Sequence, residues 1–426
     1  MSLASNLDGQ FSRPVYWSAT RIIAWQIFAL IYFQKLALTF SPRFQVSLSL
    51  ICLTALLIPG IISGVFSPRK LRLVLLATFS LAAICSQALV PSFSVASLAL
   101  LLVLCGILTL VWSVREDEYL AVCRKFSAMM VLPTLAVFLQ LVFELLHGRG
   151  HSLSLEPIIP STLLLKGFTY EASTVNWVVW NRPNGLIFLE PSFCSAFIAC
   201  AFINEFHVLK RLGRCIFFLA GLLCTSGATG IIMVGVALVV AGFRRQPLLT
   251  MLFIAASCIV LWNFQALSLN LPLLSRVSEL GNAGTSGYER LVLPIKTTID
   301  YGARADFLFR GYGAGQITGA FGNPWPISKL TFEYGLLPAV LYFVFVTVST
   351  LGSLNAPLRV ALFIAFQFTG AYLLSPFMVG LIFLTCSGQI IRPGAKSMAA
   401  APWKHHLPPL RWIPTHVFER PNSLPN

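Results

Sequence analysis

The stretch SVASLALLLVLCGILTLVWS, residues 94–113, contains no charged side chain and is long enough to cross a lipid bilayer as a helix. Similar apolar runs recur along the 426 residues, of which 57% are hydrophobic and only 11% are charged. Soluble domains contain roughly 25% charged residues, so about half of the usual charge is missing. This composition excludes an ordinary cytosolic enzyme, a secreted disulfide scaffold and a disordered chain. It predicts a protein that crosses a membrane many times.

The apolar runs predict an all-α polytopic fold with about 12 transmembrane helices in one integral membrane domain, residues 1–391. A basic, proline-rich tail, residues 392–426, follows that domain. The seventh and eighth runs are short enough to form one bent pair that does not fully cross. The predicted spans are residues 22–40, 44–65, 71–91, 94–113, 127–147, 186–206, 215–226, 229–243, 248–265, 331–351, 357–374 and 375–391.

The basic residues predict how the chain is oriented. Lys and Arg collect in cytoplasmic loops, and with the N-terminus inside, 19 of the 30 basic residues fall on the cytoplasmic side. The opposite orientation would place Arg69, Lys70 and Arg72 together in a short outer loop. We therefore expect both termini in the cytoplasm and two longer segments, residues 148–185 and 266–330, on the outer face.

Several ligand classes are not expected. The formal net charge of +15 does not indicate nucleic acid, because the basic residues are scattered and not gathered on one soluble domain. All ten cysteines lie in predicted spans or on the cytoplasmic side, which argues against a disulfide framework and a cysteine zinc site. The histidines show no metal-binding spacing, and the outer segments contain no Asp-x-Asp pair. We expect no metal and no cofactor.

The first outer segment ends in RPNGLIFLEPSF, residues 182–193. Glu190 lies just inside an apolar stretch, where an ionisable residue is costly and usually functional. Arg182 is eight residues upstream, and Pro183 and Pro191 argue against a smooth helix between the two, so they can approach each other. A buried Glu–Arg pair that only stabilises the helix is the alternative to a functional pair.

The second outer segment contains an excess of arginine, including Arg276, Arg290 and Arg310. Arginine binds phosphate through two parallel hydrogen bonds and stays charged at any relevant pH, so the excess suggests a phosphate-bearing lipid. Residues 288–299 show apolar side chains at helical spacing, with Arg290 and Lys296 beside them. A solvated amphipathic helix with ordinary surface charges is the alternative interpretation.

Three motifs between residues 180 and 350 resemble those of a known family. The first is the run at 182–192, and the second is Thr225-Ser-Gly-Ala-Thr-Gly230, although many relatives have a basic residue after its serine. The third combines Tyr288-Glu289-Arg290, Phe309–Gly313, Asn323 and Glu333–Leu337. Together they resemble the O-antigen polymerase and ligase superfamily of bacterial inner-membrane glycosyltransferases, most closely its exopolysaccharide polymerases (Wzy-like proteins).

The resemblance implies a GT-C-like glycosyltransferase that moves a polyprenyl-diphosphate-linked glycan to the acceptor sugar of another lipid-linked repeat unit, with inversion and without metal. The family's two diphosphate-binding arginines match Arg182 and Arg290, and fixed guanidiniums would stabilise the leaving group. Glu190 would orient or deprotonate the acceptor hydroxyl, with Glu289 as the fallback. We predict Glu190, Arg182 and Arg290 as catalytic residues, and as substrate-binding residues Arg310, Lys296, Arg276, Asn184, Tyr312 and Asn323.

Two other functions stay open. Ligases of this superfamily usually have a histidine in the second loop, whereas this chain has none between His207 and His405. A lipid or solute transporter would more often show an internal repeat and broken midplane helices, and the two halves show no repeat. We therefore expect a polymerase of the bacterial inner membrane with its site facing the periplasm. By resemblance, its partners are membrane lipids, a chain-length co-polymerase and a flippase.

Overall fold

The computed structural model describes a mostly helical chain of the kind expected for a membrane-embedded protein. Four helical stretches are long and apolar enough to cross a membrane, namely Lys70–Ala88, Glu116–His147, Pro191–Leu209 and Ala228–Arg245, and several shorter apolar helices accompany them. All described residues belong to one compact unit, Met1–Ile391. They are residues 18–41, 44–148, 151, 153–166, 182–252, 281, 283, 285, 288–302, 305–317, 324–350, 354–369 and 372–390.

Most helices overlap the predicted apolar runs, with different ends, whereas those within residues 116–129 and 288–334 lie largely outside these runs. The predicted span 248–265 lies mostly outside the described residues. The helices are α1 (Ala19–Tyr32), α2 (Leu48–Ile62), α3 (Lys70–Ala88), α4 (Val95–Leu108), α5 (Glu116–Met129), α6 (Val131–His147), α7 (Pro191–Asn204) with the π-helix η1 (Glu205–Leu209), α8 (Leu212–Thr225), α9 (Ala228–Arg245), the π-helix η3 (Tyr288–Val292), α12 (Leu293–Gly302), the 3₁₀ helix η4 (Ala305–Leu308), α13 (Pro326–Tyr334), α14 (Leu336–Thr350), α15 (Ala356–Phe368) and α16 (Pro376–Cys386).

Local sequence explains where several helices begin and end. Ser375 precedes α16, accepts a hydrogen bond from the Met378 N–H and is followed by Pro376, a favourable pair for a helix start. Gly335, with a φ of 92°, separates α13 from α14, so the predicted span 331–351 contains two helices. Glycine tolerates this left-handed backbone because it has no Cβ.

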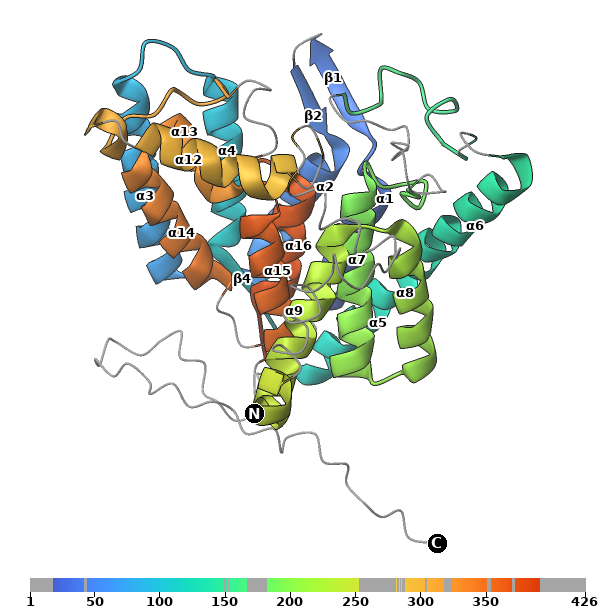
Figure 1. Ribbon diagram of the computed structural model, residues 1–426. Coiled ribbons are helices and arrows are strands. Elements are labelled where there is room, and N and C mark those ends of the chain that lie inside the picture. The colour runs from blue at the N-terminus through green and yellow to red at the C-terminus, as the bar shows by residue number, and fades with distance from the viewer. Residues whose placement is uncertain are drawn as a thin grey trace, which may run out of the picture. The chain divides into compact units, whose positions relative to one another are not determined.

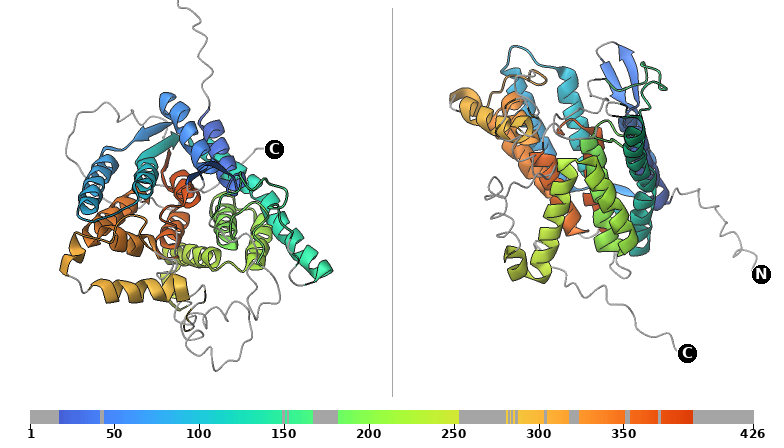
Figure 2. Two further views of the ribbon diagram at one scale, coloured as in Figure 1. Left: turned by 90° about the horizontal axis from the view of Figure 1, so that it is seen from above. Right: turned by 45° about the vertical axis from the view of Figure 1, so that its right-hand side comes forward.

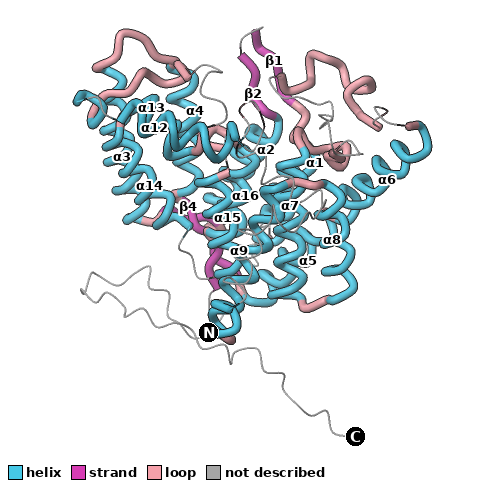
Figure 3. The backbone as a smooth tube through the Cα atoms, viewed as in Figure 1, coloured by secondary structure: helices cyan, strands magenta, loops and turns pink. Residues whose placement is uncertain are grey.

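Short strands take up residues that were predicted as span ends (Figure 3). The antiparallel hairpin of β1 (Ala37–Ser41) and β2 (Phe44–Ser47) follows α1, so the predicted first span, 22–40, is too long as a helix. A three-stranded sheet contains β3 (Phe66–Pro68), β4 (Leu110–Val114) and β5 (Gly388–Ile390), with β4 in the centre. Thr, Val, Phe and Trp in these stretches favour extended backbone.

Because β2 leads into α2 and β3 follows it, the two sheets lie at opposite ends of α2. We call these the hairpin end and the sheet end of the helices. Seen along the helices, α15 and α16 occupy the middle (Figure 2). Every residue of α16 except Thr385 is buried. Other helices surround α15 and α16, namely α1 with α2, α3 with α4 and α14, and the group from α7 to α9 (Figures 1 and 2).

At the sheet end, the side chain of Arg72, which follows Arg69 and Lys70, is buried. Its Nη1 donates hydrogen bonds to the carbonyls of Leu108 and Leu110, at 3.0 and 3.1 Å, and to Ser387 Oγ at 3.0 Å. Satisfying a buried guanidinium in this way offsets part of its desolvation cost. Arg72 thus joins the end of α4 to the segment that leads into β5.

Candidate functional site

The segment from Arg182 to Glu190 leads directly into α7. Pro183, Asn184 and Gly185 are buried, whereas Arg182 and Glu190 are partly exposed. Glu190 has extended backbone and precedes the first residue of α7, Pro191. Its Oε2 accepts a 2.9 Å hydrogen bond from Ser192 Oγ. The positive end of the helix dipole stabilises a carboxylate in this position.

A left-handed turn at Gly185 and Leu186 sets the direction of this segment. Their φ angles are 64° and 66°, and the second value is unusual for a branched, bulky residue. Gly185 also has little room for a side chain, since a Cβ would lie 3.0 Å from the Pro133 carbonyl oxygen. Strained backbone of this kind persists where surrounding contacts enforce it, and it is frequent at functional sites.

Asn184 supports this turn from inside the protein. Its Oδ1 accepts hydrogen bonds from Leu186 N–H and Gln140 Nε2, both at 3.1 Å, and its side chain is only 7% exposed. These contacts give Asn184 a structural role. Substrate binding by Asn184, which the sequence suggested, stays a prediction, and any ligand contact would have to reach a buried amide.

The second motif packs against the first turn of α7. The turn between α8 and α9 is so close to α7 that a Cβ at Gly227 would lie 2.3 Å from Ser195 Oγ. Ser195 Oγ in turn accepts a 3.2 Å hydrogen bond from the Gly230 N–H. Thr229 Oγ1 and the Tyr372 hydroxyl are 3.3 Å apart, which adds the residues before α16 to the contact. The structure therefore brings the motifs at 182–192 and 225–230 together.

Two parts of the third motif, Phe309–Gly313 and Glu333–Leu337, also meet. Tyr312 N–H donates to the Phe332 carbonyl at 2.7 Å, and Gly313 N–H donates to the Glu333 carbonyl at 3.0 Å. At Gly311 a Cβ would lie 2.3 Å from the Glu333 carbonyl carbon, so only glycine fits there. The loop at 309–317 consequently leaves the side chains of Arg310 and Tyr312 exposed.

Two further predicted cations, Arg290 and Lys296, belong to η3 and α12, and α12 runs across the direction of α3 and α14 (Figure 1). Arg290 belongs to η3, but its side chain is outside the described part of the chain. Lys296 is exposed on α12, and it lines a shallow groove of about 310 Å³ together with Val292, Ile295, Ile299 and Asp300. Arg276 and Asn323 lie outside the described residues.

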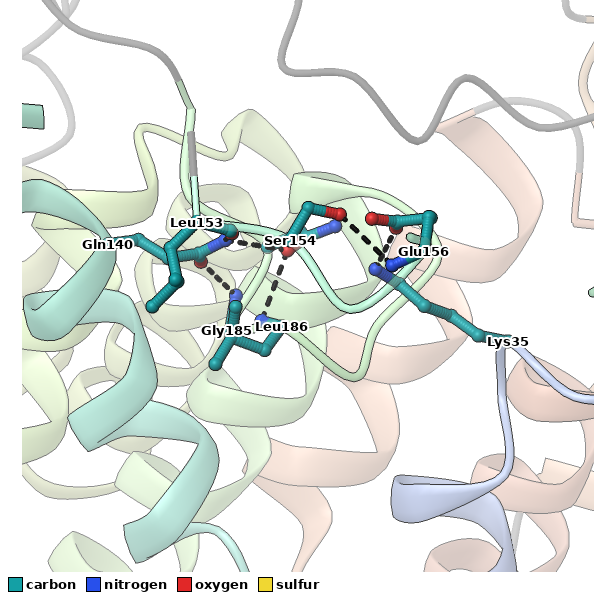
Figure 4. A network of polar contacts seen from close by, with 8 residues as sticks. Lys35, Gln140, Leu153, Ser154, Glu156, Gly185 and Leu186 are labelled. Carbon is teal, nitrogen blue, oxygen red and sulfur yellow. Dashed lines mark hydrogen bonds and ion pairs between the residues drawn. The ribbon is translucent and has the colours of Figure 1, made fainter. Parts of the chain in front are cut away.

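The contacts that hold the first outer segment were not predicted from the sequence. Lys35, predicted inside a span, lies beyond the end of α1 and forms a buried ion pair with Glu156 (Figure 4). Burial lowers the pKa of Lys35, and the Glu156 carboxylate opposes this effect. Nearby, Ala37 N–H donates to the Leu163 carbonyl at 2.8 Å, which attaches the segment to the hairpin. Only the charge of Lys35 within an apolar run could have signalled its role.

Within the described residues, no group of three His, Cys, Asp or Glu side chains could hold a metal ion. At the hairpin end the described residues offer a carboxylate, hydroxyls, amides and cations on two loops. Comparison of the chain with protein-family models, curated proteins and solved structures finds no match.

Proposed function

We propose that the protein is a polysaccharide polymerase, a glycosyltransferase that joins lipid-linked oligosaccharide repeat units. The observation that best supports this proposal is the geometry of the Arg182–Glu190 segment, which leads into α7. Hydrogen bonds from Gln140 to Asn184 and Gly185 fix this segment, while the Glu190 carboxylate stays partly exposed. A fixed, accessible carboxylate beside an apolar helix suits a hydroxyl acceptor on a membrane-bound substrate. The packing of the 225–230 turn against α7 supports the same site.

In the proposed reaction, the acceptor hydroxyl oxygen attacks C1 of the donor glycan from the side opposite the diphosphate. The new C1–O bond forms as the bond from C1 to the diphosphate oxygen breaks, and the polyprenyl diphosphate leaves with that electron pair. Arg182 and Arg290 stabilise its growing charge. Glu190 accepts the proton of the acceptor hydroxyl. The reaction needs no metal and no cofactor.

Substrate binding in this proposal involves the exposed side chains of Arg310, Lys296 and Tyr312, with Arg276, Asn184 and Asn323 as further contacts. Arginine and lysine suit the diphosphate, and the tyrosine ring suits a sugar face. Arg310 and Tyr312 lie on one loop, so a single ligand can contact both.

We also propose a GT-C-like architecture of about 12 spans in the bacterial inner membrane, with both termini cytoplasmic. The hairpin end then faces the periplasm. Two sets of hydrogen bonds support this orientation. Residues 153–166 are hydrogen-bonded to the hairpin. The loop at 309–317 is hydrogen-bonded to the end of α3 and the α3–α4 connection, which is at the same end of the helices as the hairpin. A flippase and a chain-length co-polymerase are the partners that such an enzyme would need.

The test is an assay with purified protein in detergent, a polyprenyl-diphosphate-linked oligosaccharide and no added divalent metal. We expect a ladder of products spaced by one repeat unit, and its loss in Arg290→Ala and Glu190→Gln. Arg115→Ala is the matched control, because the Arg115 side chain is 68% exposed at the start of α5 and lies at the sheet end.

Other outcomes would contradict the proposal. Transfer only to an added lipid A core would identify a ligase. If folded protein forms no product with either acceptor, a transporter is favoured. A full ladder from Arg290→Ala would show that the assignment of this arginine is wrong.

A further inference from the structure

Five buried glutamines are present among the described residues, and they are not equivalent. An amide in an apolar surrounding is costly unless it is hydrogen-bonded. Within the described chain, Gln26 and Gln34 lack a partner for Oε1, and Gln367 lacks one for either amide atom. By contrast, Gln87 and Gln140 use both ends of the amide. Their partners all belong to segments at the hairpin end.

Gln140 lies in α6 and holds both ends of the first outer segment (Figure 4). Its Nε2 donates to the Leu153 carbonyl at 2.9 Å and to Asn184 Oδ1 at 3.1 Å, and its Oε1 accepts from Gly185 N–H at 2.8 Å. One side chain from α6 thereby fixes the start of the segment and the left-handed turn that precedes Glu190.

Gln87 has the same relation to the second outer segment. It is 1% exposed in the last turn of α3, where Nε2 donates to the Glu333 carbonyl at 3.0 Å and Oε1 accepts from Ala314 N–H at 2.7 Å. The Ala314 carbonyl accepts from Ser94 N–H, just before α4. The loop with Arg310 is thus attached to the α3–α4 connection.

We propose that Gln140 and Gln87 are positioning residues for the site, each fixing one of the two loops that present the reacting and substrate-binding side chains. This inference rests on the proposed function. Glutamine suits the task because its amide offers a donor and an acceptor on one planar group, which neither glutamate nor lysine does. Small displacements of a reacting group reduce rates strongly, so the loss of either anchor lowers catalysis without removing a catalytic group.

The test uses Gln140→Met and Gln87→Met, which keep the length of the side chain and remove its hydrogen bonds. Gln26→Met is the matched control, because Gln26 is also buried and, among the described residues, its side chain hydrogen-bonds only to the Leu53 carbonyl, in α2. Two quantities are measured on full-length protein in detergent. They are the hydrogen exchange rates of backbone amides and the kcat and KM of ladder extension.

We expect faster exchange at Gly185 and Leu186 in Gln140→Met, with Ala314 unchanged. In Gln87→Met we expect faster exchange at Ala314, with Gly185 and Leu186 unchanged. We expect kcat to fall about tenfold or more in both variants, with a smaller change in KM. Gln26→Met should keep its kcat even if its melting temperature falls. If a Met variant does not fold, the corresponding Asn variant is used, and the same order of effects is expected.

Unchanged exchange at these amides, or faster exchange with an unchanged kcat, would overturn the positioning role. An equal loss of kcat in Gln26→Met would show a general effect of stability and would overturn it as well. If the wild-type protein makes no ladder, the proposed function fails, and the catalytic part of the inference fails with it. The anchoring of each loop is then decided by exchange alone.

Discussion

Glu190 is a partly exposed carboxylate at the start of a helix. It stands at the N-terminal end of α7, receives a hydrogen bond from Ser192 Oγ and keeps part of its surface exposed. In the proposed reaction, a carboxylate oxygen of Glu190 accepts the proton of the acceptor hydroxyl. Arg182 lies on the same short segment, eight residues before Glu190.

We predict that Glu190→Gln lowers the kcat of ladder extension by about 10²- to 10⁴-fold, because the amide cannot accept the acceptor proton. The melting temperature should change little, since glutamine can still accept from Ser192 Oγ. Steady-state kinetics in detergent and a thermal melt measure the two effects. Glu116→Gln, on an exposed residue at the sheet end, is the control and should leave both unchanged. An unchanged kcat in Glu190→Gln would show that another group accepts the proton.

At the scale of elements, α7 packs closely against α9 at Gly230. A Cβ at Gly230 would lie 2.4 Å from the Ser195 carbonyl oxygen, a backbone atom that cannot move aside cheaply. Close helix contacts in membranes commonly depend on small residues. This contact also holds the 225–230 turn beside the start of α7.

Gly230→Ala should therefore destabilise the protein by about 1–3 kcal/mol through overpacking. Gly235→Ala is its control in the same helix, because no atom lies within 4 Å of the added Cβ. Alanine there should be neutral or stabilising by up to about 1 kcal/mol, since it favours the helix more than glycine does. Unfolding in detergent by heat or denaturant measures both changes. Equal effects of the two substitutions would contradict the close contact.

The Lys35–Glu156 pair joins a second pair of elements, the end of α1 and the first outer segment. Lys35 is 3% exposed and Glu156 is 16% exposed, so removing either partner leaves a poorly solvated charge. We predict that Glu156→Gln costs about 3–5 kcal/mol of stability. The double variant Lys35→Met with Glu156→Leu should recover most of that loss, because a buried ion pair often contributes little more than apolar side chains of similar size. A double variant no more stable than Glu156→Gln would argue against this account.

At the scale of the whole molecule, sidedness decides whether the site can receive a periplasmic substrate. Cysteines introduced at Ile158, 77% exposed beside the hairpin, and at Leu248, 69% exposed just after α9, test it. In whole cells with a permeable outer membrane, we expect a membrane-impermeant maleimide to label Ile158→Cys. Leu248→Cys should label only after the inner membrane is opened. The reverse pattern would invert the proposed orientation and move the site to the cytoplasm.

Hydropathy alone determined the class of the molecule, because the length and lack of charge of each apolar run are local properties of the sequence. It also located Glu190 as an acid at the edge of an apolar run. It could not set the ends of α1 and α4, because strand pairing competes with the helix there. After α1 the pairing is with the adjacent strand β2, whereas after α4 it is with β3 and with the distant β5.

Only the tertiary structure decided which polar side chains support the site. Gln140 and Gly185 are 45 residues apart, Gln87 and Ala314 are 227 apart, and Lys35 and Glu156 are 121 apart. No periodicity links such pairs, because their hydrogen bonds depend on how apolar helices pack and which backbone groups that packing leaves near a buried amide or cation. The sequence by itself determined the membrane class and the residues that such a site could use. The packing of α3, α6, α7 and α9 decided how those residues are held.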